Sequence, residues 1–161
     1  MKATVADGMK IICESEEASV NLLVLDVDQK DPSLPLRCPP ECFITSDALQ
    51  KSKKILSEDG IMGKKRILPV YTVYFLSIKI FLAINLVCRD GNKRNEIIKL
   101  ASSVFEFCFV LDCGEDINKI LILSKSNIQS DLLSCGQQLR SKFDPESADS
   151  INFLLSKMKL G

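Results

Sequence analysis

Residues 21–42 of the chain read NLLVLDVDQKDPSLPLRCPPEC, in which a short apolar run leads into an acidic, proline-rich loop. The run Leu22–Leu25 is too short for a helix and is typical of a strand buried on both faces in a parallel sheet. Asp26, Asp28 and Asp31 follow it. Ligands bind beyond the carboxyl ends of strands in open α/β sheets, so these carboxylates predict a functional site. The spacing is equally consistent with Asp26 or Asp28 capping a following turn or helix.

The rest of the chain alternates between apolar runs and amphipathic segments. One amphipathic helix is predicted from Phe43 to Leu56, stopped by Asp59-Gly60, and another at residues 92–104. Further strands are predicted at residues 81–87, 105–111 and 117–123, and the short loop between the last two indicates an antiparallel hairpin. We therefore predict an α/β fold with a mostly parallel sheet and an antiparallel hairpin at its C-terminal edge.

The predicted domain covers residues 1–125, and residues 126–161 are predicted to form a peripheral helical tail. Residues 61–80 are anomalous because, joined to the next strand, they make an apolar stretch long enough to span a bilayer. Pro69, Lys79 and Asn85 interrupt this stretch, and its β-branched and aromatic residues favour a strand over a helix. Membrane insertion is therefore the less favoured alternative.

Composition narrows the class of protein. The 161 residues carry 21 Lys and Arg against 21 Asp and Glu, which argues against a nucleic-acid footprint or a polybasic membrane patch. The absence of histidine removes the commonest general base and the commonest zinc ligand. Seven irregularly spaced cysteines indicate reduced, mostly buried thiols in a cytoplasmic protein. Cys38 and Cys42 have no second pair to complete a metal site, so no metal is expected.

Four segments together resemble a known family. They are VADGM at residues 5–9, VLDVD at 24–28 with Asp31, CPP at 38–40 with Phe43, and AINLVCRD at 83–90. In this order they are similar to the spermidine-synthase-like, S-adenosylmethionine-dependent methyltransferases, and most of all to the lysine and N-terminal methyltransferases of elongation factor 1 alpha. The resemblance covers residues 3–123 apart from 61–80. Removing 61–80 restores the family's spacing, so this segment is interpreted as an insertion.

The resemblance implies a partial Rossmann-like class I methyltransferase fold, S-adenosylmethionine as cofactor, and a protein amine, on elongation factor 1 alpha, as substrate. It implies that Asp7 accepts a hydrogen bond from the adenine amino group and that Gly8 allows close backbone approach. Asp26 would face both the sulfonium and the incoming amine, with Asp28 as the alternative catalytic carboxylate. The competing interpretation is that Asp7 only builds its turn. Asn85 is expected to satisfy backbone groups at the strand end.

The sequence departs from the family in one large respect. No Gly-rich turn precedes Asp7, so the chain begins near the family's third strand and the half that grips most of the cofactor is missing. We therefore expect a chain that is weak or inactive alone. One alternative is a non-catalytic module that pairs with a further copy or another chain through an exposed sheet edge. The other is a membrane-anchored fragment that uses residues 61–80 onward as its span.

Overall fold

The structure is a computed structural model that describes residues 5–57, 81–112, 117–128 and 159–160. Its elements, in chain order, are α1 (Gly8–Glu14), β1 (Leu22–Leu25), β2 (Leu36–Cys38), the 3-10 helix η1 (Glu41–Ile44), α2 (Ser46–Ile55), β3 (Phe81–Cys88), α3 (Gly91–Val104), β4 (Phe107–Asp112), β5 (Asn118–Ser124) and β6 (Lys159–Leu160). The predicted insertion at 61–80 and residues 129–158 of the predicted tail lie outside these ranges. Within them, no helix has the length and apolar character needed to cross a membrane.

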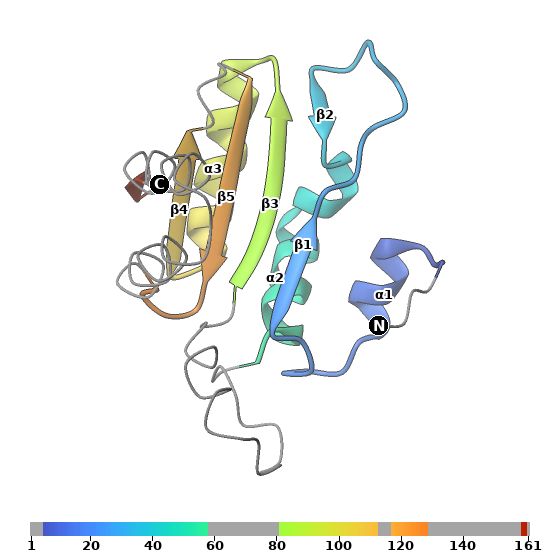
Figure 1. The fold of residues 1–161 in the computed structure, drawn as a ribbon, viewed down its shortest axis with the longest axis vertical. Helices are drawn as coiled ribbons and strands as arrows, with labels where there is room; N and C mark the ends of the chain where they lie inside the picture. Colours follow the sequence, from blue (N-terminus) through green and yellow to red (C-terminus); the bar gives the residue numbers. More distant parts are fainter. Residues whose placement is uncertain (1–4, 58–80, 113–116, 129–158, 161) are drawn as a thin grey trace, which may run out of the picture.

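The strands form a mixed sheet in the order β1-β3-β5-β4-β6, with β2 attached to β3. β1 is parallel to β3, whereas β5 is antiparallel to both β3 and β4. β1, β3 and β4 therefore point in one direction, and β5 runs between β3 and β4 in the opposite direction (Figure 1). The predicted α/β class and the antiparallel hairpin are confirmed. The hairpin is also integrated into the sheet on both sides, because β5 pairs with β3 and β4 pairs with β6.

The larger of two buried hydrophobic clusters lies between the sheet and the helices α2 and α3, which are behind the sheet in Figure 1; the smaller one is built on Phe109 and Ile122. Every second residue of β3 is fully buried in the larger cluster, as the two-residue period of a strand requires; these residues are Leu82, Ile84, Leu86 and Cys88. The helices contribute Leu49 and Ile97 to the same cluster. Asn85 therefore lies on the opposite face of β3, away from the helices, where it is half-buried.

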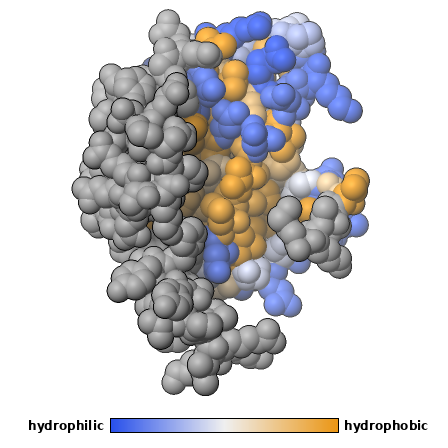
Figure 2. Space-filling model, in the orientation of Figure 1, coloured by the Kyte–Doolittle hydropathy of each residue, from blue (hydrophilic) through white to orange (hydrophobic). Residues whose placement is uncertain are grey.

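The predicted strand at Leu22–Leu25 is confirmed as β1, and its parallel pairing is confirmed by the register of Leu25 with Ile84. The prediction that it is buried on both faces is wrong. Leu25 is only 4% exposed, but Leu22 is 53% and Val24 57% exposed. In the described part of the chain only β3 pairs with β1, and the core shared with α2 and α3 includes Leu25 but neither Leu22 nor Val24. Figure 2, which has the orientation of Figure 1, shows apolar surface exposed at the centre of this face.

Two predicted helix boundaries change in the structure. The predicted helix at Phe43–Leu56 divides into η1 and α2, and the Thr45 side chain caps α2 by accepting a hydrogen bond from the Ala48 N–H. α2 ends at Ile55, before the predicted stop, because Leu56 leaves the helix to form a parallel bridge with Val20. In the predicted helical tail, Lys159–Leu160 pairs with β4 as a strand, so the helical prediction is wrong for these two residues.

Candidate functional site

The loop after β1 is fastened to the end of β3. β2 pairs antiparallel with β3, with Leu36 opposite Cys88 and Cys38 opposite Val87. The Arg89 N–H donates a further hydrogen bond of 2.9 Å to the Pro35 carbonyl. These contacts hold the returning end of the proline-rich loop beside β3, so residues that are distant in sequence meet where β1 ends.

Asp26 is the first residue after β1, and two side chains donate hydrogen bonds to one of its oxygens. The Asn85 side-chain amide lies 2.9 Å from Asp26 Oδ1, and the Cys38 thiol sulfur lies 3.8 Å from the same atom. The Asp26 side chain is otherwise exposed, and its Oδ2 has no partner in the part of the chain that the structure describes. The carboxylate is therefore held at one oxygen and open at the other.

The Cys38 thiol is fully buried and remains a hydrogen-bond donor at neutral pH. Burial raises the pKa of this thiol from 9.0 to about 11, and a hydrogen bond from the Val27 backbone opposes that shift. The negative charges of Asp26 and Asp28 add to the increase, because each disfavours a thiolate nearby. Asp28 therefore lies close enough to act electrostatically on the same cluster, although the structure shows no direct contact between the two carboxylates.

Asp31, by contrast, builds its own turn. Its Oδ1 accepts hydrogen bonds from the Ser33 backbone N–H at 2.9 Å and from the Ser33 hydroxyl at 2.7 Å. The hydroxyl contact is the main reason that the pKa of Asp31 is lowered. Asp26 does not cap a turn or helix, because its hydrogen-bond donors are side chains from β3 and β2.

Asp7 and Gly8 begin α1, and the structure brings neither into contact with Asp26. Asp7 is the N-cap of the helix and accepts a hydrogen bond of 3.0 Å from the Lys10 N–H. Gly8 lies against the Phe43 ring, whose Cζ would be 3.1 Å from a Cβ at this position. Asp7 therefore builds the turn that begins α1, as one of the two interpretations predicted. In Figure 1, α1 begins at about the height at which β1 ends.

Asn85 has a different hydrogen-bond partner from the one predicted. It donates to a side chain, not to the backbone groups that it was expected to satisfy. The available signal was its position, because a lone amide inside an apolar strand has no packing explanation. The role of Cys38 in contacting Asp26 was not predicted either, since the CPP motif carries no information about which neighbour the thiol meets.

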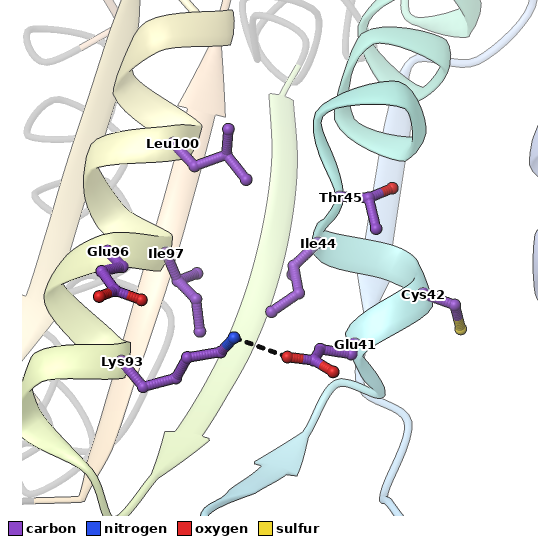
Figure 3. A pocket seen from close by; sticks show the side chains of 8 residues that line it. All are labelled: Glu41, Cys42, Ile44, Thr45, Lys93, Glu96, Ile97 and Leu100. Carbon is purple, nitrogen blue, oxygen red and sulfur yellow. Dashed lines mark ion pairs between the residues drawn. The ribbon is translucent and has the colours of Figure 1, made fainter.

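A cavity of about 310 Å³ lies between η1 and α3. Figure 3 shows Glu41 and Lys93 pointing toward each other across it, and their charged groups form an ion pair of 2.6 Å. Its lining residues are Glu41, Cys42, Ile44, Thr45, Lys93, Glu96, Ile97 and Leu100. None of them is among the predicted site residues, so this cavity is separate from the carboxylate cluster.

Comparison with known proteins identifies the chain's relatives. It is 29% identical over 124 residues to the eEF1A lysine and N-terminal methyltransferase of Xenopus laevis, and 30% identical over 125 residues to that of Bos taurus. Each alignment covers 75% of this chain but 15% of the relative. A crystal structure of human methyltransferase-like protein 13 in complex with SAH matches 98% of this chain and 60% of that chain, with a TM-score of 0.60 and 25% identity. No protein-family model matches.

The structural match agrees with the mixed α/β sheet. The chain spans about 15% of the length of the curated relatives that it matches. The chain is therefore a homologue of one segment of the eEF1A lysine and N-terminal methyltransferases.

Proposed function

We propose that these 161 residues carry the acceptor-amine side of an S-adenosylmethionine-dependent methyl-transfer site. The substrate is a protein amine, a lysine or an N-terminus, and eEF1A is the first candidate because the relatives are named for it. The observation that supports this proposal most is the Asp26 carboxylate at the end of β1, held through Oδ1 and open at Oδ2.

A carboxylate in this position suits amine methylation. An amine must lose its proton before it attacks a methyl group, and a nearby carboxylate can orient the ammonium and accept that proton. Asp28 places a second negative charge near Asp26, which favours a cationic substrate. The bound cofactor supplies the methyl group, and the protein's main contribution is to align the reacting atoms.

Asp7 fits the cofactor's adenine as well as its own turn. The helix cap occupies only Oδ1, and the side chain is exposed, so the second carboxylate oxygen is available to an amino group. Gly8 has a different constraint, since the space beside it is taken by Phe43. The 161 residues contain no Gly-rich turn that would hold the rest of the cofactor, so we propose weak cofactor binding and at most trace methyl transfer by these residues alone.

The proposal is tested by incubating the chain with tritium-labelled S-adenosylmethionine and purified eEF1A, and counting label in the protein. We expect trace incorporation that Asp26→Asn abolishes. Asp31→Asn is the matched control and should retain the trace, because among the described residues this loop carboxylate is hydrogen-bonded to Ser33 and not to the Asp26 cluster. Robust turnover by the chain would contradict the weak-alone proposal, and equal label from Asp26→Asn would contradict the role of Asp26.

A second candidate function is a non-catalytic interaction module, which the exposed apolar residues of β1 favour. Leu22 and Val24 lie on a strand whose outer edge has no partner among the described residues, and such edges recruit further strands. Light scattering after size-exclusion chromatography would show an assembly that Val24→Lys disrupts. A monomer at all concentrations, with no change in Val24→Lys, would count against self-association through β1.

A further inference from the structure

Two hydrogen-bond donors from two different strands converge on Asp26 Oδ1. Asn85 belongs to β3 and Cys38 to β2, and both strands are fixed to each other by antiparallel pairing. An exposed aspartate side chain normally samples several rotamers in water. Here the amide at 2.9 Å and the thiol at 3.8 Å restrict it from two directions.

We propose that Asn85 and Cys38 are positioning residues that hold Asp26 Oδ1, so that Oδ2 is presented to the substrate's amine. This inference rests on the proposed function, because it assigns the open oxygen to the ammonium. Neither residue touches the substrate. Their contribution is to hold the carboxylate in one orientation before the substrate arrives, which a reactive site requires to within a fraction of an ångström.

The surroundings of Cys38 support this role. The thiol is completely buried, it receives a backbone hydrogen bond from Val27, it donates to Asp26 Oδ1, and the negative charge of Asp28 also acts on it. A protonated thiol in this position can only donate toward a carboxylate. Serine preserves a donor at this position, whereas alanine removes it, so the two substitutions separate hydrogen bonding from packing.

The test uses the ¹⁵N-labelled chain and n-butylammonium chloride, whose aliphatic stem and ammonium imitate a lysine side chain. Amide shifts at residues 26–28 give the dissociation constant, with potassium chloride as the ionic-strength control. Asn85→Ala and Cys38→Ala are expected to weaken binding by about fivefold, because the freed carboxylate must then be ordered when the amine binds. Cys38→Ser should restore most of the affinity, and Asp31→Asn should leave it unchanged.

The outcomes distinguish this inference from the function on which it rests. If the unmodified chain binds n-butylammonium at residues 26–28 but Asn85→Ala and Cys38→Ala bind it equally well, the positioning role is wrong and the amine site stands. If the unmodified chain gives no shifts beyond those of potassium chloride, the amine site itself fails and the inference fails with it. If Cys38→Ala loses affinity for n-butylammonium and Cys38→Ser does not restore it, the effect comes from packing and the proposed role of the thiol is wrong.

Discussion

Asn85 and Asp26 are 59 positions apart in the sequence, yet the amide of one donates a 2.9 Å hydrogen bond to the carboxylate of the other. The parallel pairing of β1 with β3 brings them together, because Leu25 is in register with Ile84 and the next residues of both strands are neighbours. Asn85 alternates with the β3 residues that pack against α2 and α3, so the bond lies on the opposite face of the strand. Its contribution therefore concerns the orientation of Asp26 more than the stability of the core.

This hydrogen bond should appear as an energetic coupling between the two residues. In a double-mutant cycle of Asp26→Ala and Asn85→Ala, we expect a coupling of about 1 kcal/mol in the free energy of unfolding, measured with urea. The control cycle pairs Asn85→Ala with Asp31→Ala and should give additive effects, because the hydrogen bonds of Asp31 within the described ranges come from Ser33 and not from Asn85. A coupling within error of zero in the first cycle would show that the bond does not form in solution.

Stability should depend on pH through Cys38. Because the pKa of the folded thiol is raised from 9.0 to about 11, the folded chain binds more protons than the unfolded chain between these values. The stabilisation is therefore complete below pH 9.0 and is lost as the pH rises through about 11. A shift of this size corresponds to about 3 kcal/mol.

The measurement is the difference in the free energy of unfolding between the unmodified chain and Cys38→Ser at each pH, since serine does not titrate in this range. Titration of lysines and tyrosines cancels in that difference. A difference that stays constant from neutral pH to pH 11 would show that the thiol is not buried beside the two carboxylates.

Asp7 should have two separable roles. Asp7→Ala removes the cap of α1 and should lower the free energy of unfolding by about 1 kcal/mol, whereas Asp7→Ser retains a capping oxygen and should change it little. If Asp7 also receives the adenine amino group, Asp7→Ser should still lose affinity for S-adenosylhomocysteine in ligand-detected NMR. If Asp7→Ser binds S-adenosylhomocysteine with unchanged affinity, Asp7 caps the helix and does not bind the adenine.

Gly8 should be required for packing against Phe43. An alanine normally stabilises a helix relative to glycine by about 1 kcal/mol, but here its Cβ would lie 3.1 Å from the Phe43 ring. We expect Gly8→Ala to be destabilising in the unmodified chain and less so in the Phe43→Leu background, as measured by thermal unfolding. Equal effects in both backgrounds would indicate that the ring is not the obstacle.

Local patterns in the sequence predicted most of the elements but not their neighbours. The apolar run of Leu22–Leu25 and the alternation around Asn85 specify strands, because side-chain periodicity is a local property. The exposure of Val24 depends on which strands and helices lie beside β1, and that information is not local. For the same reason, the hairpin's short loop predicted antiparallel pairing but not the insertion of β5 between β3 and β4.

In the candidate site, too, the local feature was predictable and the tertiary contacts were not. Asp26 was identified because it follows a strand, which is a general rule for α/β sheets. Its hydrogen-bond partners were not predicted. Asn85 lies beside Asp26 because of the register between β1 and β3, and Cys38 lies there because β2 pairs with β3 after the proline-rich loop. Both contacts depend on tertiary pairing across long stretches of chain.

If one end of this sheet forms part of a cofactor and amine site, S-adenosylhomocysteine should bind there, and an NMR titration of the ¹⁵N-labelled chain measures this. We expect weak, saturable amide shifts confined to residues 7–10 and 26–29, with the β4–β5 hairpin unaffected. Spectra that show no shifts at these residues up to the solubility limit of the ligand, or shifts that centre on the hairpin, would contradict this prediction.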